Sequence, residues 1–217
     1  MRICILDLCA IPREPAAFAA LAASLPFGQE ERERLLSLRN PDSARRSLGA
    51  ALALFELIKE QDSKALTVRR EKGGKPYFSD RPDLPFSLTH TEDFSAAALS
   101  EQEGLVGLDI ELIRHDRNIH GIASRFFSPE EREALAAASD SALCFTHIWT
   151  QKEALAKRSG QGLAAQLGKT SFSPSCHIRH VRLTLGTKDA VLCVAAEHPI
   201  HTLSIHTASD SVRWQKS

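Results

Sequence analysis

The spacing of apolar residues along the chain changes between the period of a helix and the alternation of a strand. Apolar positions three to four apart predict helices, and alternating or short continuous apolar runs predict strands. We expect helices over residues 14–24, 29–38, 43–60 and 141–159, and a further helix opening at Ser128. We expect strands over residues 3–8, 66–70, 85–90, 94–100, 105–112, 170–172, 178–185, 190–195 and 203–206. This mixture predicts an α+β fold.

Local signals place some of the boundaries. Asn40–Asp42 forms a turn with a ready N-cap. Ser128–Glu131 puts Ser at the N-cap, Pro at the first helical position and Glu at the third, which is a capping box. Gly160–Gly162 stops the helix that begins at residue 141. Lys72–Pro76 contains two glycines and a proline, so we expect a mobile basic loop there.

Two stretches of the chain resemble each other in order and offset. Leu6-Asp7-Leu8 resembles Leu108-Asp109-Ile110, and the charged helix after residue 29 resembles the helix after residue 129. A long helix and several strands follow in each case. We therefore predict a duplicated α+β unit, with halves at residues 1–102 and 103–217 and a ligand between them.

Composition narrows the possible partners. The chain has 217 residues, 27 basic and 27 acidic, with 43% hydrophobic and 25% charged residues. A neutral balance provides no global basic field for nucleic acid. No uncharged run approaches the length of a membrane span. The five cysteines have no zinc-ligand spacing, so we interpret them as small core residues of a cytoplasmic protein that binds neither nucleic acid nor membrane.

One helical face carries three chemically distinct side chains. Trp149, Glu153 and Lys157 are spaced at i, i+4 and i+8, so they share a face of the helix over residues 141–159. Taken alone, this pattern favours an ordinary surface helix with an anchored Trp and a Glu–Lys ion pair over a functional site. Asp109 and Glu111 favour a functional site, because residues two apart on a strand share one face and place two further carboxylates together. The alternative for these two is a solvated strand edge.

The oxygen-only ligand set indicates the class of ion. Two strand carboxylates with Glu153 as a third suit a hard cation such as Mg²⁺, which binds carboxylates together with phosphate oxygens of a substrate. Basic or hydroxyl side chains that could hold phosphates are Arg45, Arg46, Lys72, Lys75, Thr89, His90 and Thr91. Each of them is individually also explained as an ordinary solvated residue. Together they predict a magnesium-dependent site for a polyanion laid across the junction of the halves.

The motifs resemble a known family. Gly107–Glu111, Arg125–Ser128 and Trp149–Leu163 resemble the signature of 4′-phosphopantetheinyl transferases, and Gly74–Pro76 and Phe86–Thr91 match the larger, Sfp-like class. The resemblance runs from about residue 29 to residue 163. It implies a monomer built from two similar halves, a pseudo-twofold duplication with the active site between them. It also implies transfer of the phosphopantetheine arm of coenzyme A to a serine of an apo acyl or peptidyl carrier protein, with release of adenosine 3′,5′-bisphosphate.

The resemblance also implies roles for individual residues. Asp109, Glu111 and Glu153 would ligate Mg²⁺, or Mn²⁺ in its place. Glu153 would accept the serine proton, directly or through a metal-bound water. Lys157 would contact the pyrophosphate and assist the leaving group. The coenzyme A anchors would be Arg45, Arg46, Lys75, Thr89 and His90, with Lys157. Trp149 would fix the helix by packing.

Two positions depart from the family pattern. Thr89-His90-Thr91 stands where Ser-His-Ser is common, which keeps both hydroxyl groups. Glu31 stands where some relatives have a Lys facing the nucleotide, and Arg34, one turn on, is a candidate to supply that charge.

Two other functions stay open on the sequence alone. One is a non-catalytic module that binds coenzyme A or a carrier protein, although simple anion binding gains nothing from three carboxylates. The other is a metal-dependent nucleotide phosphohydrolase, which needs no protein partner. Fatty-acid, polyketide and nonribosomal-peptide carriers all stay open as the partner.

Overall fold

The first half of the chain is a sheet backed by helices. The computed structural model describes residues 1–59, 66–166, 168, 176–207 and 212–214. Strand β1 (Arg2–Asp7) leads through a 3-10 turn, η1 (Leu8–Ala10), into three helices. These are α1 (Pro15–Ala23), α2 (Gln29–Ser37) and α3 (Pro41–Ile58). A small hairpin of β2 (Val68–Arg70) and β3 (Pro76–Phe78) precedes a second hairpin of β4 (Phe86–Thr91) and β5 (Phe94–Leu99).

The second half begins with the strand that carries the predicted carboxylates. This is β6 (Val106–Leu112), followed by α4 (Ile119–Phe126), α5 (Pro129–Ala137) and α6 (Ser141–Ser159). A 3-10 turn, η2 (Leu163–Gln166), follows α6. The remaining strands are β7 (His177–Leu185), β8 (Lys188–Ala196), β9 (Ser204–Thr207) and β10 (Val212–Trp214).

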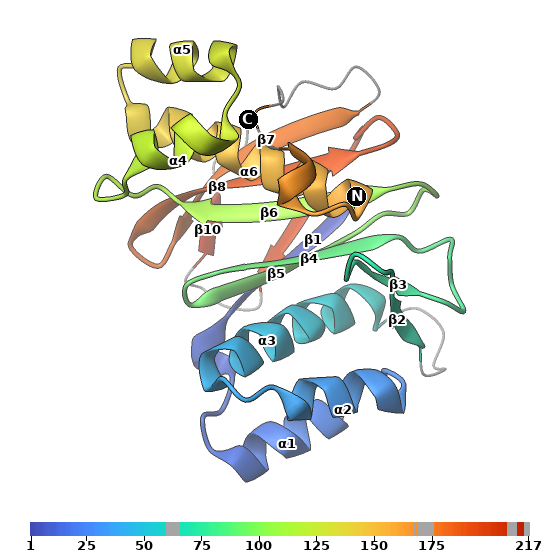
Figure 1. Ribbon diagram of the computed structural model, residues 1–217. Helices are drawn as coiled ribbons and strands as arrows, with labels where there is room; N and C mark the ends of the chain where they lie inside the picture. The colour runs from blue at the N-terminus through green and yellow to red at the C-terminus, as the bar shows by residue number, and fades with distance from the viewer. Residues whose placement is uncertain (60–65, 167, 169–175, 208–211, 215–217) are drawn as a thin grey trace.

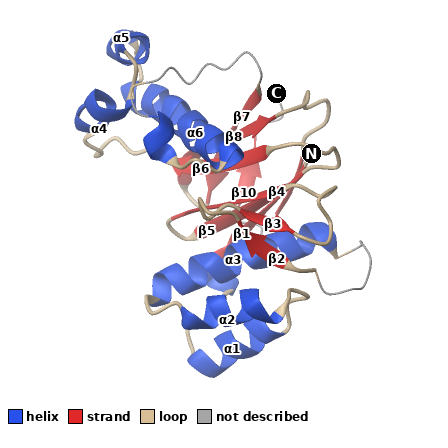
Figure 2. Cartoon of the chain, turned by 45° about the vertical axis from the view of Figure 1, so that its right-hand side comes forward, coloured by secondary structure: helices blue, strands red, loops and turns tan. Residues whose placement is uncertain are grey.

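Two four-stranded sheets lie face to face, and helices cover the outer face of each. One sheet has the order β4-β5-β1-β9 and the other β10-β7-β8-β6. Helices α1, α2 and α3 lie on the outer side of the first sheet, whereas α6 lies over the second and carries α4 and α5 packed against it (Figures 1 and 2). The late strand β9 pairs in parallel with β1, so the C-terminal half contributes a strand to the first sheet.

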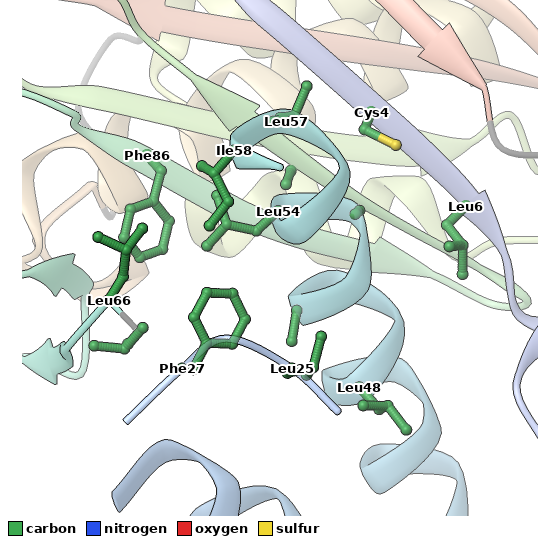
Figure 3. Packing of buried hydrophobic residues seen from close by; sticks show 14 of the residues in the cluster. Cys4, Leu6, Leu25, Phe27, Leu48, Leu54, Leu57, Ile58, Leu66 and Phe86 are labelled. Atoms are coloured by element: carbon green, nitrogen blue, oxygen red, sulfur yellow. The ribbon is translucent and has the colours of Figure 1, made fainter. Parts of the chain in front are cut away.

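Alternation along the strands builds two separate cores. On β4, Phe86 lies on the side of α3 that carries Leu54 and Ile58, close to Phe27 (Figure 3). The opposite faces of β1 and β5 meet the second sheet, in a core that includes Ile3, Ile5, Leu108, Ile110, Leu192 and Val194. Because successive strand residues point to opposite faces, β6 buries residues 106, 108, 110 and 112 between the sheets. Residues 107, 109 and 111 are thereby left to face α6.

Most predicted elements are confirmed, and the capping box at Ser128 is present with both of its hydrogen bonds. The sequence prediction missed α4, β3 and β10, which are only 8, 3 and 3 residues long. The expected strand at residues 170–172 lies outside the described residues. Interpretation of every cysteine as a core residue is wrong for Cys9, which is exposed in η1, whereas Cys4 and Cys193 are buried. None of the described helices combines the length and apolar character that crossing a membrane requires.

Helix α6 approaches β6 closely at one residue. A Cβ atom built on Gly107 would lie 1.9 Å from the carbonyl oxygen of Ala154 and 2.5 Å from the backbone nitrogen of Arg158. Separations below 3.0 Å are not tolerated, and both of these atoms are backbone. Only glycine therefore lets α6 lie this close to the strand.

We predict that Gly107→Ala lowers the free energy of unfolding by about 1–3 kcal/mol, because α6 must move away from β6. Urea denaturation measures this difference. The matched control is Gly28→Ala, where the nearest atom to the added methyl group lies at 3.9 Å. The control should lose less than about 1 kcal/mol, the scale of a changed helix cap. Equal losses in the two variants would contradict the close-contact explanation.

Candidate active site

Strands β4 and β6 meet edge to edge, and their side chains join the two halves. The Ser87 hydroxyl oxygen accepts a hydrogen bond from the backbone nitrogen of Leu108 at 2.9 Å. Two residues along, the Thr89 hydroxyl donates to Oδ1 of Asp109 at 3.0 Å. Lys157 donates from α6 to both groups, at 2.8 Å to Thr89 and 2.7 Å to Asp109. Three predicted site residues from three elements are therefore in direct contact.

Glu111 is held by groups beyond the predicted set. The indole nitrogen of Trp149 donates to its Oε1 at 3.2 Å, and Arg117 donates to its Oε2 at 3.3 Å. The Arg117 guanidinium also lies 5.8 Å from the centre of the Trp149 ring. Trp149 is buried against Phe126 and Phe145, as its predicted packing role requires. It has the additional function of orienting a carboxylate.

Glu153 lies between Trp149 and Lys157 on α6, and the negative charge of its ionised side chain is electrostatically unfavourable there. Desolvation first, and then the charge of Asp109, raise the pKa of Glu153 to about 7. The positive charge of Lys157 acts in the opposite direction but does not cancel them. Burial and the neighbouring Asp109 likewise raise the pKa of Glu111. These mutual effects show that the three carboxyl groups share one environment.

The expected i to i+4 pair on α6 is not what the structure contains. Among the described residues, the ion pair of Lys157 is with Asp109 rather than with Glu153. The physical reason is the depth of Asp109, whose side chain is only 6% exposed and gains more from a cation than the less buried Glu153 does.

A divalent cation fits the chemistry of this group of carboxylates. No three His, Cys, Asp or Glu side chains of the described residues form a ready-made ligand group. Protein donors bind Oδ1 of Asp109 and both oxygens of Glu111. Within the described part, however, Oδ2 of Asp109 is buried and has no hydrogen-bond partner. A buried, unpartnered carboxylate oxygen is costly, and a hard cation is a group that would satisfy it. Asp109, Glu111 and Glu153 are the residues that could hold one.

The predicted basic residues separate into two groups. Lys75 donates to the backbone carbonyl of Arg158 at the end of α6, and burial lowers the pKa of Lys75. Desolvation, and then the charges of Lys157 and Arg46, lower the pKa of His90, so these cations are electrostatic neighbours. Arg45 is placed elsewhere. It is buried and donates to the carbonyl oxygen of Leu8 at 2.6 Å, and the structure does not bring it to the carboxylates. The reason is helical geometry, since adjacent residues of α3 point in directions about 100° apart.

A cavity of about 190 Å³ extends from Glu153 toward the β2–β3 hairpin. Lys157 and Lys75 line it together with Glu153. The remaining lining residues are Gly73, Gly74, Pro76, Phe86, Ser87, Leu88, Ala156, Gly160, Gly162 and Leu163. This cavity connects the two predicted groups, the acidic cluster and the glycine loop.

Sequence reasoning missed Arg117 and the hydrogen-bonding role of Trp149. Arg117 follows β6 by a loop, and no spacing rule relates a loop residue to a strand carboxylate. The indole nitrogen offered a weak signal, because a buried Trp N–H generally finds an acceptor.

Comparisons with known proteins agree on one family. A sequence model of the 4′-phosphopantetheinyl transferase superfamily matches residues 105–203. The chain is 30% identical over 169 residues to 4′-phosphopantetheinyl transferase Sfp of Bacillus subtilis, covering 70% of this chain and 73% of that protein. It is 37% identical over 145 residues to 4′-phosphopantetheinyl transferase AcpT of Escherichia coli K12, covering 65% and 69%. It is also 34% identical over 99 residues to 4′-phosphopantetheinyl transferase HetI of a Nostoc species, covering 43% and 41%.

We predict that Glu153→Gln stabilises the metal-free protein at high pH. Between the ordinary pKa of 4.5 and the folded value of about 7, the folded protein binds more protons than the unfolded chain. Its free energy of unfolding therefore falls as pH rises through this window. Removing the charge should raise the free energy of unfolding by about 1–3 kcal/mol at about pH 8 and change it little at about pH 5.

Thermal and urea unfolding in a chelator, at both pH values, measures this effect. Glu133→Gln is the matched control, because Glu133 is an exposed residue of α5 away from the cluster. An equal effect of Glu153→Gln at both pH values would show that burial of the charged carboxylate is not its cause.

Proposed function

The chain belongs to the 4′-phosphopantetheinyl transferase superfamily, and we propose that it transfers the 4′-phosphopantetheine arm of coenzyme A to a serine of an apo carrier protein. The proposed products are the holo carrier protein and adenosine 3′,5′-bisphosphate. The carrier is an acyl or peptidyl carrier protein. The observation that carries the proposal is the contact of Thr89, Asp109 and Lys157 beside Glu153 at the edge of a cavity between the halves.

The acidic residues are proposed to hold a divalent cation together with the substrate. Asp109, Glu111 and Glu153 would be its protein ligands. When bound, Mg²⁺ or Mn²⁺ supplies positive charge beside the pyrophosphate and favours departure of the phosphate leaving group. The unpartnered oxygen of Asp109 supports this assignment, because it is already oriented without a protein donor.

Proton transfer is assigned to Glu153. The carrier serine must lose its proton as its oxygen attacks the phosphorus of the pantetheine phosphate, and the bond to the bisphosphate leaving group breaks. A carboxyl group with a raised pKa is a more effective base near neutral pH than an ordinary exposed one. Glu153 would accept the proton directly or through a water. Trp149 and Arg117 would hold Glu111 in place during the step.

The cations anchor the substrate in this proposal. Lys157 would exchange its contact with Asp109 for the pyrophosphate and stabilise the charge that develops on the leaving group. Lys75, Thr89, His90 and Arg46 would hold the 3′-phosphate and the pyrophosphate. The placement of Arg45 against Leu8 gives no support to its predicted role, which stays a prediction.

We also propose that the fold is a pseudo-twofold duplication, with halves at residues 1–102 and 103–217. The order of elements supports it. Strand β1, helices α1 and α2, long helix α3 and hairpin β4–β5 correspond to β6, α4, α5, α6 and β7–β8. Long helices α3 and α6 each pack on one sheet. A monomeric state and a cytoplasmic location stay predictions.

The transferase proposal predicts a mass change in a carrier protein. A panel of apo fatty-acid, polyketide and nonribosomal-peptide carriers is incubated with coenzyme A and Mg²⁺. The intact mass of each carrier is then measured by mass spectrometry. We expect at least one carrier to gain one phosphopantetheine group, and a chelator to prevent the gain. Glu153→Gln should lower the rate by at least about 100-fold, the usual contribution of a general base.

Two controls make this experiment decisive. Glu133→Gln should keep the wild-type rate, and circular dichroism should show that both variants are folded. No mass gain on any carrier would contradict the transferase. Release of bisphosphate without a carrier would favour the phosphohydrolase, and coenzyme A binding without transfer or Mg²⁺ dependence would favour the binding module.

A further inference from the structure

A buried acidic residue of α2 links that helix to the β2–β3 hairpin. Glu31 is only 5% exposed. Its carboxylate accepts two hydrogen bonds from Arg34, at 2.7 and 2.8 Å. Arg70 of strand β2 donates to the same two oxygens at 3.1 and 3.3 Å. One buried negative charge therefore lies between two guanidinium groups, one from α2 itself and one from β2, 39 residues along the chain from Glu31.

Arg70 extends this link to the glycine loop. Its other terminal nitrogen, Nη1, donates to the carbonyl oxygen of Gly74 at 3.2 Å. The turn is closed by the bond from the Gly74 nitrogen to the carbonyl of Glu71 at 2.8 Å, and by the bond from the Glu71 nitrogen to the carbonyl of Lys75 at 2.9 Å. A single guanidinium thus connects the buried carboxylate of α2 with the turn.

The same turn lies against the end of α6 and lines the cavity. A Cβ atom on Gly73 would lie 2.0 Å from the carbonyl oxygen of Gly160, so the two backbones are in close contact. Lys75 donates to the carbonyl of Arg158, two residues before Gly160. Gly73, Gly74 and Lys75 all line the cavity that Glu153 and Lys157 also line. A shift of the turn would therefore change the shape of the cavity that Glu153 lines.

We infer that Glu31 and Arg70 are positioning residues that hold the Gly73–Lys75 turn in the conformation that binds the nucleotide part of coenzyme A. The inference rests on the proposed function, which supplies the identity of the ligand. Neither side chain lines the cavity. Both act through the backbone of the turn.

Electrostatics alone predicts the opposite effect for Glu31. Coenzyme A is a polyanion, so removing a nearby negative charge should strengthen its binding. If Glu31 instead anchors Arg70, removing its charge loosens the turn and weakens binding. The sign of the change in Glu31→Gln therefore separates positioning from simple charge effects.

The experiment measures KM for coenzyme A and kcat, with a carrier that the wild-type protein modifies. We expect Glu31→Gln and Arg70→Gln each to raise KM by about tenfold, the scale of losing charge-assisted hydrogen bonds. We expect kcat at saturating coenzyme A to change by less than about twofold. The reason is that the variants weaken binding of coenzyme A equally in the ground state and in the transition state. Arg70→Lys keeps the charge but lacks the fork that reaches both partners, so it should also raise KM.

A matched control pair lies one residue before Glu31 on α2 and one residue before Arg70 on β2. Arg69 of β2 forms an ion pair with Glu30 of α2, and both side chains are largely exposed. Glu30→Gln and Arg69→Gln make the same charge changes close to the same place. Neither should raise KM by more than about twofold, since exposed ion pairs contribute little.

A second measurement does not depend on catalysis. Hydrogen exchange of the Gly74 amide in the ligand-free protein should be faster in Arg70→Gln than in Arg69→Gln, because the turn has lost its anchor. An inactive wild-type protein would contradict the proposed function, and the exchange result would still test the anchor. With an active wild-type protein, an unchanged or lower KM in Glu31→Gln, or equal exchange rates in the two arginine variants, would overturn the inference.

Discussion

The contact of α6 with β6 at Gly107 is the constraint on which the candidate site depends. A side chain at this position would meet the backbone of α6 at 1.9 Å. Because glycine allows the helix to lie on the strand, Lys157 reaches Asp109 at 2.7 Å and Trp149 reaches Glu111 at 3.2 Å. The same contact brings Glu153 into the field of both carboxylates. The geometry of the site is therefore set by the backbone first and by the side chains second.

The site brings negative charges together, and the neighbouring cations offset only part of the resulting repulsion and desolvation. Three carboxyl groups are gathered in a largely buried place, and burial together with the charge of Asp109 raises the pKa values of Glu111 and Glu153. Lys157 and Arg117 compensate part of this charge, but one oxygen of Asp109 is left buried without a donor among the residues that the structure describes. A cation and a polyanionic substrate arriving together would complete the compensation. Such locally unfavourable arrangements are expected at functional sites, where activity rather than stability determines the residues.

The junction of the halves is held by side chains that also shape the site. Ser87 and Thr89 tie the edge of the first sheet to β6. At the β4–β5 turn, Glu92 pairs with Arg114 and Lys188 of the second half. At the C-terminal end of α6, the Gly73–Lys75 turn contacts Gly160. The cavity lies between these contacts, so its dimensions follow from how the halves pack and from how the turn is anchored on α2.

The sequence by itself determined the elements and the chemical type of the site. Periodicity located α3, α6 and β6 to within a few residues, because long amphipathic patterns and caps are local properties. Residue spacing placed Asp109 with Glu111, and Trp149, Glu153 and Lys157 together, since strand and helix periods are fixed by backbone geometry. Short elements such as α4 and β3 have patterns too brief to identify.

Only the tertiary structure decided which groups meet. It paired Lys157 with Asp109 instead of Glu153, brought Arg117 to Glu111 and directed Arg45 away to Leu8. It also joined Glu31 to Arg70 across 39 residues of chain. These contacts depend on how buried each charge becomes and on how helices pack on sheets. Burial and packing are properties of the assembled fold, and no local spacing rule contains them.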